Sequence, residues 1–531
     1  MNLPLTPLRF LERAQNLYGD KQGIICGELR LTYAEFFDRC RRLAGVLAGL
    51  AIRPGDRVAF LGYNCHRLLE GYYGVLLAGG VLLPINIRLS PAEIAFILKD
   101  SGAKVLFFDP EFIALVESMR GAGGIDCRCI NLEETTQTPS WAEFRSYDAL
   151  LSASTPVAFD YLPVDENSIA ELFYTSATTG DPKGVMLSHR AIYLHALNLI
   201  AVQRYTDQSV QLHAIPLFHA NGWGSAHTVT AVGGTHVMMR RFDPERICQL
   251  IEREKGTCLC VVPTMVNTLL HFPDLARYDF RSMEWVHVGG AAASEGLIGR
   301  LEDALGCNCY AGYGLTEASP VLTVATLKDT LRGRSRDEQF RRKSTTGRAI
   351  VGVELRVVDE NGADVARDGC AIGEIWARGD GVMEGYWGRP QESEETLRGG
   401  WLRTGDMAVW DDDGYVTIVD RKKEIIISGG ENISTLEIEK ALAAHPAVFE
   451  CAVIAVPDET WGETPKALVV LKQGASSTEA ELLAHLRGRI AKFKLPRSVE
   501  FLAILPKGGT GKILKKVLRE KYWEGYVKRV H

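Results

Sequence analysis

The chain has 531 residues, more than one small domain needs, so two or three domains are expected. Its 46% hydrophobic and 24% charged residues are typical of a soluble globular protein, and its net charge of −6 gives no reason to expect a nucleic-acid partner. The first residues lack the unbroken apolar core of a signal peptide. The 12 cysteines include no C-x-x-C pair, which argues against a zinc site, and a cytoplasmic location is expected.

The most apolar long run is residues 72–87, "YYGVLLAGGVLLPINI". It is interrupted by Gly79, Gly80 and Pro84 and is shorter than the roughly 20 residues that a membrane-spanning helix needs. The sequence therefore predicts a buried strand–turn–strand here, with no transmembrane segment. Peripheral membrane association stays open.

Further along, short apolar runs end in small-residue loops before helical stretches. Examples are "IAELFYTS" (169–176), "CLCVVPTM" (258–265), "WVHVGGAAAS" (285–294) and "CNCYAGYGLTE" (307–317). Strands that alternate with helices predict α/β layers with mostly parallel sheets, whose ligands gather beyond the carboxyl ends of the strands. Ser188 is predicted to cap a helix that begins at residue 189.

The last part of the chain has a different pattern. Short strands are expected in 373–387 and 413–428, and then helices at 435–446 and 479–496 around a strand at 448–458. This indicates a small α+β domain, with predicted boundaries of 1–420 for the large domain, 421–423 for a hinge and 424–531 for the small domain. The charged stretch 327–348 is predicted to be a solvated loop.

Residues 174–184, "YTSATTGDPKG", crowd hydroxyl groups and glycines beside Lys183. Hydroxyls, backbone N–H groups and one cation suit a polyphosphate, although a surface turn has a similar composition. Two other loops fail the tests for known phosphate motifs. "GGTGKI" (508–513) lacks the first glycine and the metal-binding hydroxyl of a P-loop, and "GYGLTE" (312–317) lacks the third glycine of a dinucleotide fingerprint.

Seven segments occur in one order: "YTSATTGDPKG", "PLFHANGW", "GGAAAS", "YGLTE", "WLRTGD", "DRKKEIIISGGENIS" and "LPKGGTGKI". Together they resemble the adenylate-forming superfamily over nearly the whole chain, and most closely its medium- and long-chain fatty-acyl-CoA synthetases. The resemblance implies an α/β fold, with a large N-terminal domain of layered α/β subdomains, a small β-barrel-like part and a small mobile α+β C-terminal domain. It also implies ATP, Mg²⁺ and CoA as cofactor and co-substrates, and a homodimer is consistent with it.

The implied first half-reaction forms an acyl-adenylate from a carboxylic acid and ATP. The implied phosphate-binding residues are Thr175, Ser176, Thr178, Thr179, Gly180 and Lys183, with Ala177 standing where the family has glycine. Tyr313 and Gly314 would hold adenine together with Gly290, Ala291 and Ala292, and Asp406 and Arg421 would bind ribose. Thr316 would touch the α-phosphate, Glu317 would hold Mg²⁺ with Thr175, and Lys512 would reach the reacting carboxylate.

The implied acid site contains His219, Trp223 and Gly289, and Trp223 matches a tryptophan that gates the fatty-acid tunnel of long-chain relatives. In the second half-reaction CoA displaces AMP after the small domain rotates about Lys423, with Gly429 and Gly430 lining the pantetheine channel. The alternatives are a ligase that loads a carrier protein, a CoA ligase for an aromatic or branched acid, and a nucleotide sensor that has lost catalysis.

Overall fold

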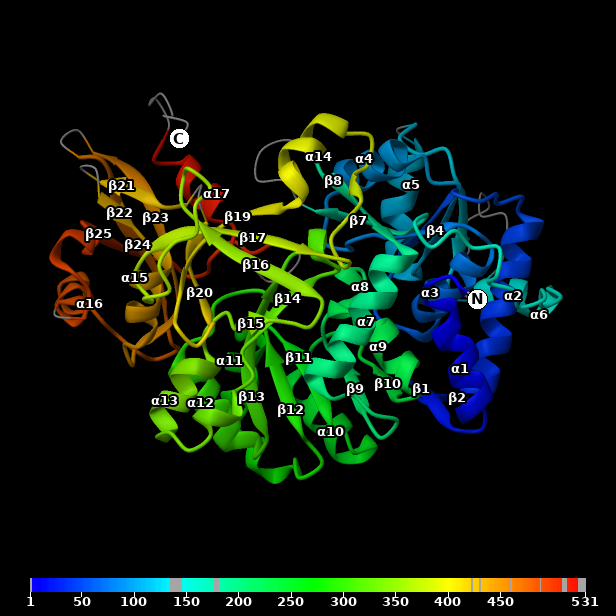
Figure 1. Ribbon diagram of the computed structural model, residues 1–531, viewed down its shortest axis with the longest axis horizontal. Helices are drawn as coiled ribbons and strands as arrows, with labels where there is room; N and C mark the ends of the chain where they lie inside the picture. The colour runs from blue at the N-terminus through cyan, green and yellow to red at the C-terminus, as the bar shows by residue number, and fades with distance from the viewer. Residues whose placement is uncertain are drawn as a thin grey trace.

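The described part of the chain is organised around four β-sheets (Figure 1). The computed structural model describes residues 2–121, 123–133, 146–175, 181–421, 424–428, 431–458, 461–487, 489–508 and 513–523. Figure 1 shows the C-terminal part, in orange and red, on the opposite side of the molecule from helices α1 (Leu8–Tyr18), α2 (Tyr33–Gly49) and α3 (His66–Leu77).

Two large sheets form the body of the protein. The nine-stranded sheet has the order β15-β14-β13-β12-β11-β9-β10-β1-β2. In chain order its strands are β1 (Gln22–Cys26), β2 (Leu29–Thr32), β9 (Val210–His213), β10 (Thr235–Met238), β11 (Cys258–Val261), β12 (Trp285–Val288), β13 (Asn308–Gly314), β14 (Val321–Val324) and β15 (Arg348–Ala349). The seven-stranded sheet has the order β18-β8-β7-β4-β3-β5-β6. Its strands are β3 (Arg57–Leu61), β4 (Val81–Pro84), β5 (Val105–Phe108), β6 (Arg128–Asn131), β7 (Ile169–Thr175), β8 (Lys183–Ser188) and β18 (Gly385–Tyr386).

The centres of both large sheets are parallel, as predicted. Strands β10, β9, β11, β12 and β13 pair in parallel, and so do β7, β4, β3, β5 and β6. The carboxyl ends of β12 and β13 therefore meet at one edge, which is where ligands gather in such sheets.

Two smaller sheets follow, the first antiparallel and the second mixed. Strands β16 (Val353–Val358), β17 (Ile372–Gly379), β19 (Leu402–Trp410) and β20 (Val416–Arg421) form the small all-β part. The C-terminal sheet joins β21 (Ile426–Ser428), β22 (Glu431–Ile433), β23 (Val448–Asp458), β24 (Gly462–Leu471) and β25 (Ser498–Phe501). The predicted mixed α/β architecture is confirmed.

The remaining helices cover or connect these sheets. They are α4 (Pro91–Ser101), α5 (Ile113–Gly121), α6 (Tyr147–Ala153), α7 (His189–Gln203), α8 (Ala220–Trp223), α9 (Ser225–Val232), α10 (Pro244–Glu254), α11 (Pro263–Leu270), α12 (Glu295–Leu305), α13 (Arg336–Lys343), α14 (Pro390–Thr396), α15 (Thr435–Ala443), α16 (Glu479–Leu486) and α17 (Lys515–Glu520). The predicted cap at Ser188 is confirmed, because its hydroxyl accepts a hydrogen bond from the Ala191 N–H at 3.2 Å.

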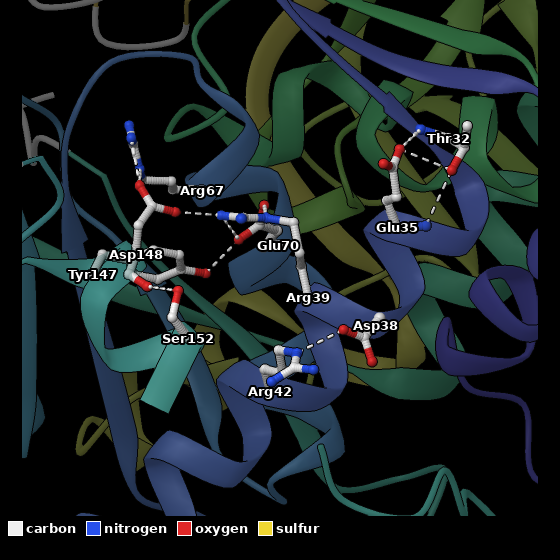
Figure 2. A network of polar contacts seen from close by, with 10 residues as sticks. All are labelled: Thr32, Glu35, Asp38, Arg39, Arg42, Arg67, Glu70, Tyr147, Asp148 and Ser152. Atoms are coloured by element: carbon white, nitrogen blue, oxygen red, sulfur yellow. Dashed lines mark hydrogen bonds and ion pairs between the residues drawn. The ribbon is translucent and has the colours of Figure 1, made fainter. Parts of the chain in front are cut away.

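The largest buried apolar cluster lies between the two large sheets. It joins α1, α2 and α3 to strand β1 of one sheet and strands β3 and β5 of the other. Figure 2 shows the polar network that ties α2, α3 and α6 together at the edge of this core. Arg39 Nε donates to Glu70 Oε1 at 2.6 Å, and the Tyr147 hydroxyl donates to Glu70 Oε2 at 2.7 Å. Glu70 is fully buried, so these donors replace the water that its carboxylate loses.

Three expectations for individual segments are corrected. Residues 72–77 belong to helix α3, so the apolar run is helix–turn–strand; a helix buried on all sides shows no amphipathic period. The charged stretch contains helix α13, where Lys343 is buried and its Nζ pairs with Glu302 Oε2 at 2.6 Å. The helix expected at 479–496 ends at Leu486.

Among the described residues, no helix is both long enough and apolar enough to cross a membrane.

Candidate functional site

Asp406 joins residues from three strands. Asp406 on β19 lies opposite Arg421 on β20 in the antiparallel register, and Arg421 Nε contacts Asp406 Oδ1 at 3.1 Å. From β13, the Tyr313 hydroxyl donates to Asp406 Oδ2 at 2.5 Å. Asp406 is 3% exposed, and each of its carboxylate oxygens has a partner, so its orientation is fixed without a ligand. We call these three residues the Asp406 cluster.

The pKa values in the Asp406 cluster are shifted by burial and by the neighbouring charges. Burial raises the pKa of Tyr313 well above its usual range, and the neighbouring carboxylate adds to the effect, so the phenol remains a hydrogen-bond donor. Asp406 raises the pKa of Arg421, which stays charged. The cluster therefore offers a carboxylate, a cation and an aromatic ring at one place. This combination suits the ribose and base of a nucleotide.

The loop after β12 provides close backbone approach. Gly290 has φ +78°, a conformation that side chains rarely adopt. A Cβ at Gly289 would come within 3.0 Å of two ring atoms of Trp223, so the indole lies directly on this glycine. Ala291 and Ala292 follow and are exposed.

Trp223 is carried on a left-handed turn. Residues 220–224 all have positive φ, with Trp223 itself at +60°. Such values cost roughly 1–2 kcal/mol for each non-glycine residue, so other contacts must hold the turn. Asn221 provides them, because its Nδ2 donates to Glu171 Oε2 at 3.0 Å and its Oδ1 accepts from the Gly224 N–H at 2.7 Å.

Glu171 is the fixed point for this turn. It is fully buried on β7, and its Oε1 lies 2.6 Å from His227 Nε2. His219, the polar residue that was predicted for the acid site, is half-buried at the start of the turn. The sequence did not indicate Glu171 and Asn221 as positioning residues, because 50 residues separate the two partners.

A second group of predicted residues meets around Tyr386. The Tyr386 hydroxyl donates to Glu317 Oε1 at 2.9 Å, and Lys183 Nζ lies 5.2 Å from the centre of the Tyr386 ring. Strand β18 brings Tyr386 there by pairing with β8. Thr175 lies opposite Lys183 in the β7–β8 register, and Thr316 is buried beside Glu317. One tyrosine, absent from the predicted site, therefore lies between Lys183 and Glu317.

Lys183 already has an acidic partner. Its Nζ forms an ion pair with Glu392 Oε2 on helix α14, and both side chains are about one-third exposed. An anion that binds Lys183 must therefore compete with this carboxylate, which no motif of the sequence predicted there.

Several predicted site residues lie outside the described residues. They are Ser176, Ala177, Thr178, Thr179, Gly180, Lys423, Gly429, Gly430 and Lys512. Gly314, at the end of β13, is within the description, and a Cβ there would come 1.8 Å from the Pro320 carbonyl oxygen. Only glycine fits at this position.

Family models match both parts of the chain: AMP-binding enzyme over residues 11–387, and AMP-binding enzyme C-terminal domain over residues 437–512. The long-chain-fatty-acid–CoA ligase of Thermus thermophilus is 40% identical, covering 97% of this chain and 95% of the relative. A crystal structure of an anthranilate CoA ligase in complex with anthranoyl-AMP matches with a TM-score of 0.89 at 26% identity, over 98% of each chain. ATP-bound MatB from Rhodopseudomonas palustris matches with a TM-score of 0.86 at 30% identity, over 99% of this chain and 100% of that chain.

The chain therefore belongs to the AMP-binding enzyme family, and the predicted resemblance is confirmed. Within that family its class is that of the AMP-forming acid–CoA ligases. The acids in the relatives' names range from long-chain fatty acids to anthranilate, so the comparisons leave the acid open.

Proposed function

We propose that the protein is an ATP-dependent acid–CoA ligase that works through an acyl-adenylate and acts on a fatty acid. The observation that carries this proposal is the Asp406 cluster, a buried carboxylate held by a phenol and a guanidinium. A vicinal diol matches two carboxylate oxygens, which is why ribose is the expected ligand.

In the first half-reaction, a carboxylate oxygen of the acid attacks the α-phosphorus of ATP. A bond from that oxygen to phosphorus forms, the bond to the bridging oxygen breaks, and pyrophosphate leaves with its electron pair. Asp406 accepts hydrogen bonds from the ribose hydroxyls, Tyr313 stacks on adenine, and the backbone at Gly290–Ala292 approaches the adenine edge. Thr316 contacts the α-phosphate, and Lys512 neutralises the charge that gathers there.

Mg²⁺ fits the residues around Tyr386. Glu317 supplies a carboxylate and Thr175 a hydroxyl, and Mg²⁺ is usually bound by one or two carboxylates together with substrate phosphates and water. No group of three or more acidic, histidine or cysteine ligands occurs among the described residues, which agrees with a site that phosphates must complete. When bound, the ion would neutralise phosphate charge. Lys183 and the hydroxyls of 175–179 would contact the outer phosphates.

In the second half-reaction the CoA thiolate attacks the acyl carbon, and AMP leaves. We propose that residues 424–531 rotate about Lys423 between the two steps, with Gly429 and Gly430 lining the thiol's path. Contacts near this hinge would have to break. Asp420 Oδ2 accepts hydrogen bonds from the Thr435 N–H at 2.6 Å and the Thr435 hydroxyl at 2.8 Å.

A fatty acid is proposed because the acid site is bounded by apolar groups. Trp223 covers Gly289, where the carboxylate would lie, and belongs to a buried apolar cluster that extends through β11 and β12. Carrier-protein pantetheine as the acceptor, and aromatic or branched acids, are the alternatives.

The test is a panel of straight-chain acids, branched acids and benzoate, each incubated with ATP, Mg²⁺ and either CoA or a carrier protein. We expect AMP release and a CoA thioester with fatty acids, and at least a tenfold lower rate for the Asp406→Ala variant, because it removes both acceptors for ribose. AMP release with none of the acids would refute the proposal. If a thioester forms only on the carrier protein, the acceptor is the carrier-protein pantetheine and not CoA.

The pairing of Lys183 with Glu392 yields a quantitative prediction. Replacing Glu392 with Gln should lower the KM for ATP by up to about fivefold, because a partly exposed ion pair is worth at most about 1 kcal/mol and its loss frees Lys183 for phosphate. Pyrophosphate exchange at varied ATP measures this. Glu395→Gln, an exposed position on the same helix, is the matched control. An equal change in both variants would show a general charge effect instead.

A further inference from the structure

His287 is a buried polar residue without an assigned task. It lies on β12, two residues before Gly289, and it is 3% exposed. Its Nδ1 lies 2.9 Å from Nε2 of Gln203, at the end of helix α7. Its Nε2 has no hydrogen-bond partner among the described residues, although an unpaired buried polar atom is costly.

The protonation of His287 follows from these neighbours. Burial lowers its pKa to about 4, so the ring is neutral at pH 7. The Gln203 amide nitrogen faces Nδ1 and donates to it, which places the ring proton on Nε2. The unpartnered atom is therefore a hydrogen-bond donor, and the group that it lacks is an acceptor.

His287 Nε2 lies in the wall of the proposed acid site. Residues two apart on a strand point to the same face, so His287 shares its face with Gly289. Gly312 on β13 lies beside Gly289, since Val288 pairs with Ala311, and a Cβ at Gly312 would come 2.2 Å from His287 Nε2. The Trp223 ring lies against Gly289, and its centre is 5.6 Å from that of the His287 ring.

His287 and Gly289 are two residues apart at the end of β12, a span of about 7 Å. An acid whose carboxylate lies at Gly289 would therefore place its fourth or fifth carbon near the His287 imidazole, provided that the Trp223 indole moves aside. A wholly aliphatic tail would leave Nε2 unpaired. An oxygen on the tail at this depth would satisfy it.

We propose that His287 is a specificity-determining residue that donates a hydrogen bond from Nε2 to an oxo or hydroxyl oxygen on the tail of the acid. The substrate class is then a fatty acid that carries such an oxygen about four or five carbons from its carboxyl end. This inference rests on the proposed acid–CoA ligase function.

The test uses pairs of acids with the same shape. 4-Oxohexanoate is compared with 4-methylhexanoate, and 5-oxohexanoate with 5-methylhexanoate, as a ratio of kcat/KM values for CoA-thioester formation. For at least one pair the oxo acid is expected to be preferred about tenfold, the value of one buried hydrogen bond. His287→Leu should abolish this preference. Because each ratio compares two acids on one variant, a common loss of activity cancels.

Two further variants make the result specific. Gln203→Leu removes the donor that fixes the ring tautomer and should reduce the preference, whereas Val286→Ala, on the opposite face of β12, should leave the ratio as in the wild type. Circular dichroism and thermal unfolding verify that each variant is folded.

The inference is overturned if the wild type shows no preference within either pair, or if the preference survives in His287→Leu. Calorimetric titration of the same acids separates this from failure of the proposed function. A binding preference that needs His287, without any thioester, would refute only the ligase function. Activation of both acids at equal rates would refute only the role of His287.

Discussion

Lowering the pH from 7 to 5 is expected to remove several kcal/mol of the free energy of unfolding. The cause is a set of buried, neutral histidines. Burial lowers the pKa values of these side chains to about 3 for His66, His195 and His213, and to about 4 for His189 and His287.

The sign follows from proton linkage. Above about pH 6.5 these histidines are neutral in both states, and they do not alter stability. Below about pH 6.5 these histidines become protonated in the unfolded chain, but in the folded chain they stay neutral until the pH reaches about 4 to 3. The free energy of unfolding therefore falls as the pH falls. At pH 5 each histidine contributes a loss of about 2 kcal/mol, and the five together up to about 10 kcal/mol, comparable with the whole stability of a typical domain.

Other buried groups act in the opposite sense. Burial raises the pKa values of Glu70, Asp420 and Glu439, so the folded chain takes up protons at these sites before the unfolded chain does. Their contribution offsets part of the loss. The net expectation is a steep fall in stability between pH 6.5 and 5.

Thermal and urea unfolding at pH 7, 6 and 5, with the proton uptake measured on unfolding, tests this. His189→Gln should reduce the uptake at pH 5 by nearly one proton, because burial lowers the pKa of His189 to about 4 in the folded chain. A stability that stays flat from pH 7 to pH 5 would contradict the assignment of neutral buried histidines.

The Lys512→Ala variant is expected to lose about two to three orders of magnitude in the rate of acyl-adenylate formation, while thioester formation from supplied acyl-adenylate changes little. Removing one preorganised charge-stabilising donor typically costs this much, and only the first half-reaction crowds a carboxylate against the α-phosphate. Pyrophosphate exchange measures the first step, and release of AMP from acyl-adenylate and CoA measures the second. Equal losses in both would contradict the role.

Contacts of the segment that follows Lys512 support this prediction. Lys515, three residues after Lys512, donates from Nζ to the Thr435 hydroxyl at 2.6 Å, and Thr435 in turn donates to Asp420. Asp420 directly precedes the arginine of the Asp406 cluster. The segment after Lys512 is thus tied close to the proposed ribose site. Lys516→Ala, an exposed lysine in the same basic segment, is the matched control and should leave both steps unchanged.

The sequence predicted much of the fold because the relevant rules act over short distances. The strand in "CNCYAGYGLTE", the cap at Ser188 and the helix–strand pair α15–β23 all follow from neighbouring residues, and the structure has each of them. The prediction for the run at 72–87 was wrong because rules that act over short distances do not decide this case. Its apolar side chains are consistent with either a buried helix or a buried strand, and only packing between two sheets decides.

By itself the sequence determined the family, the α/β class and the residues proposed for the nucleotide, since motifs are local strings whose order identifies them. Only the tertiary structure joined Asp406 to Tyr313, placed Glu392 against Lys183, and left the Nε2 atom of His287 buried without a partner. The physical reason is that a hydrogen bond or ion pair depends on distances of about 3 Å between atoms that the chain can separate by more than 200 residues, as it does Lys183 and Glu392. Which buried polar atoms are satisfied is decided by packing, and no pattern along the sequence records it.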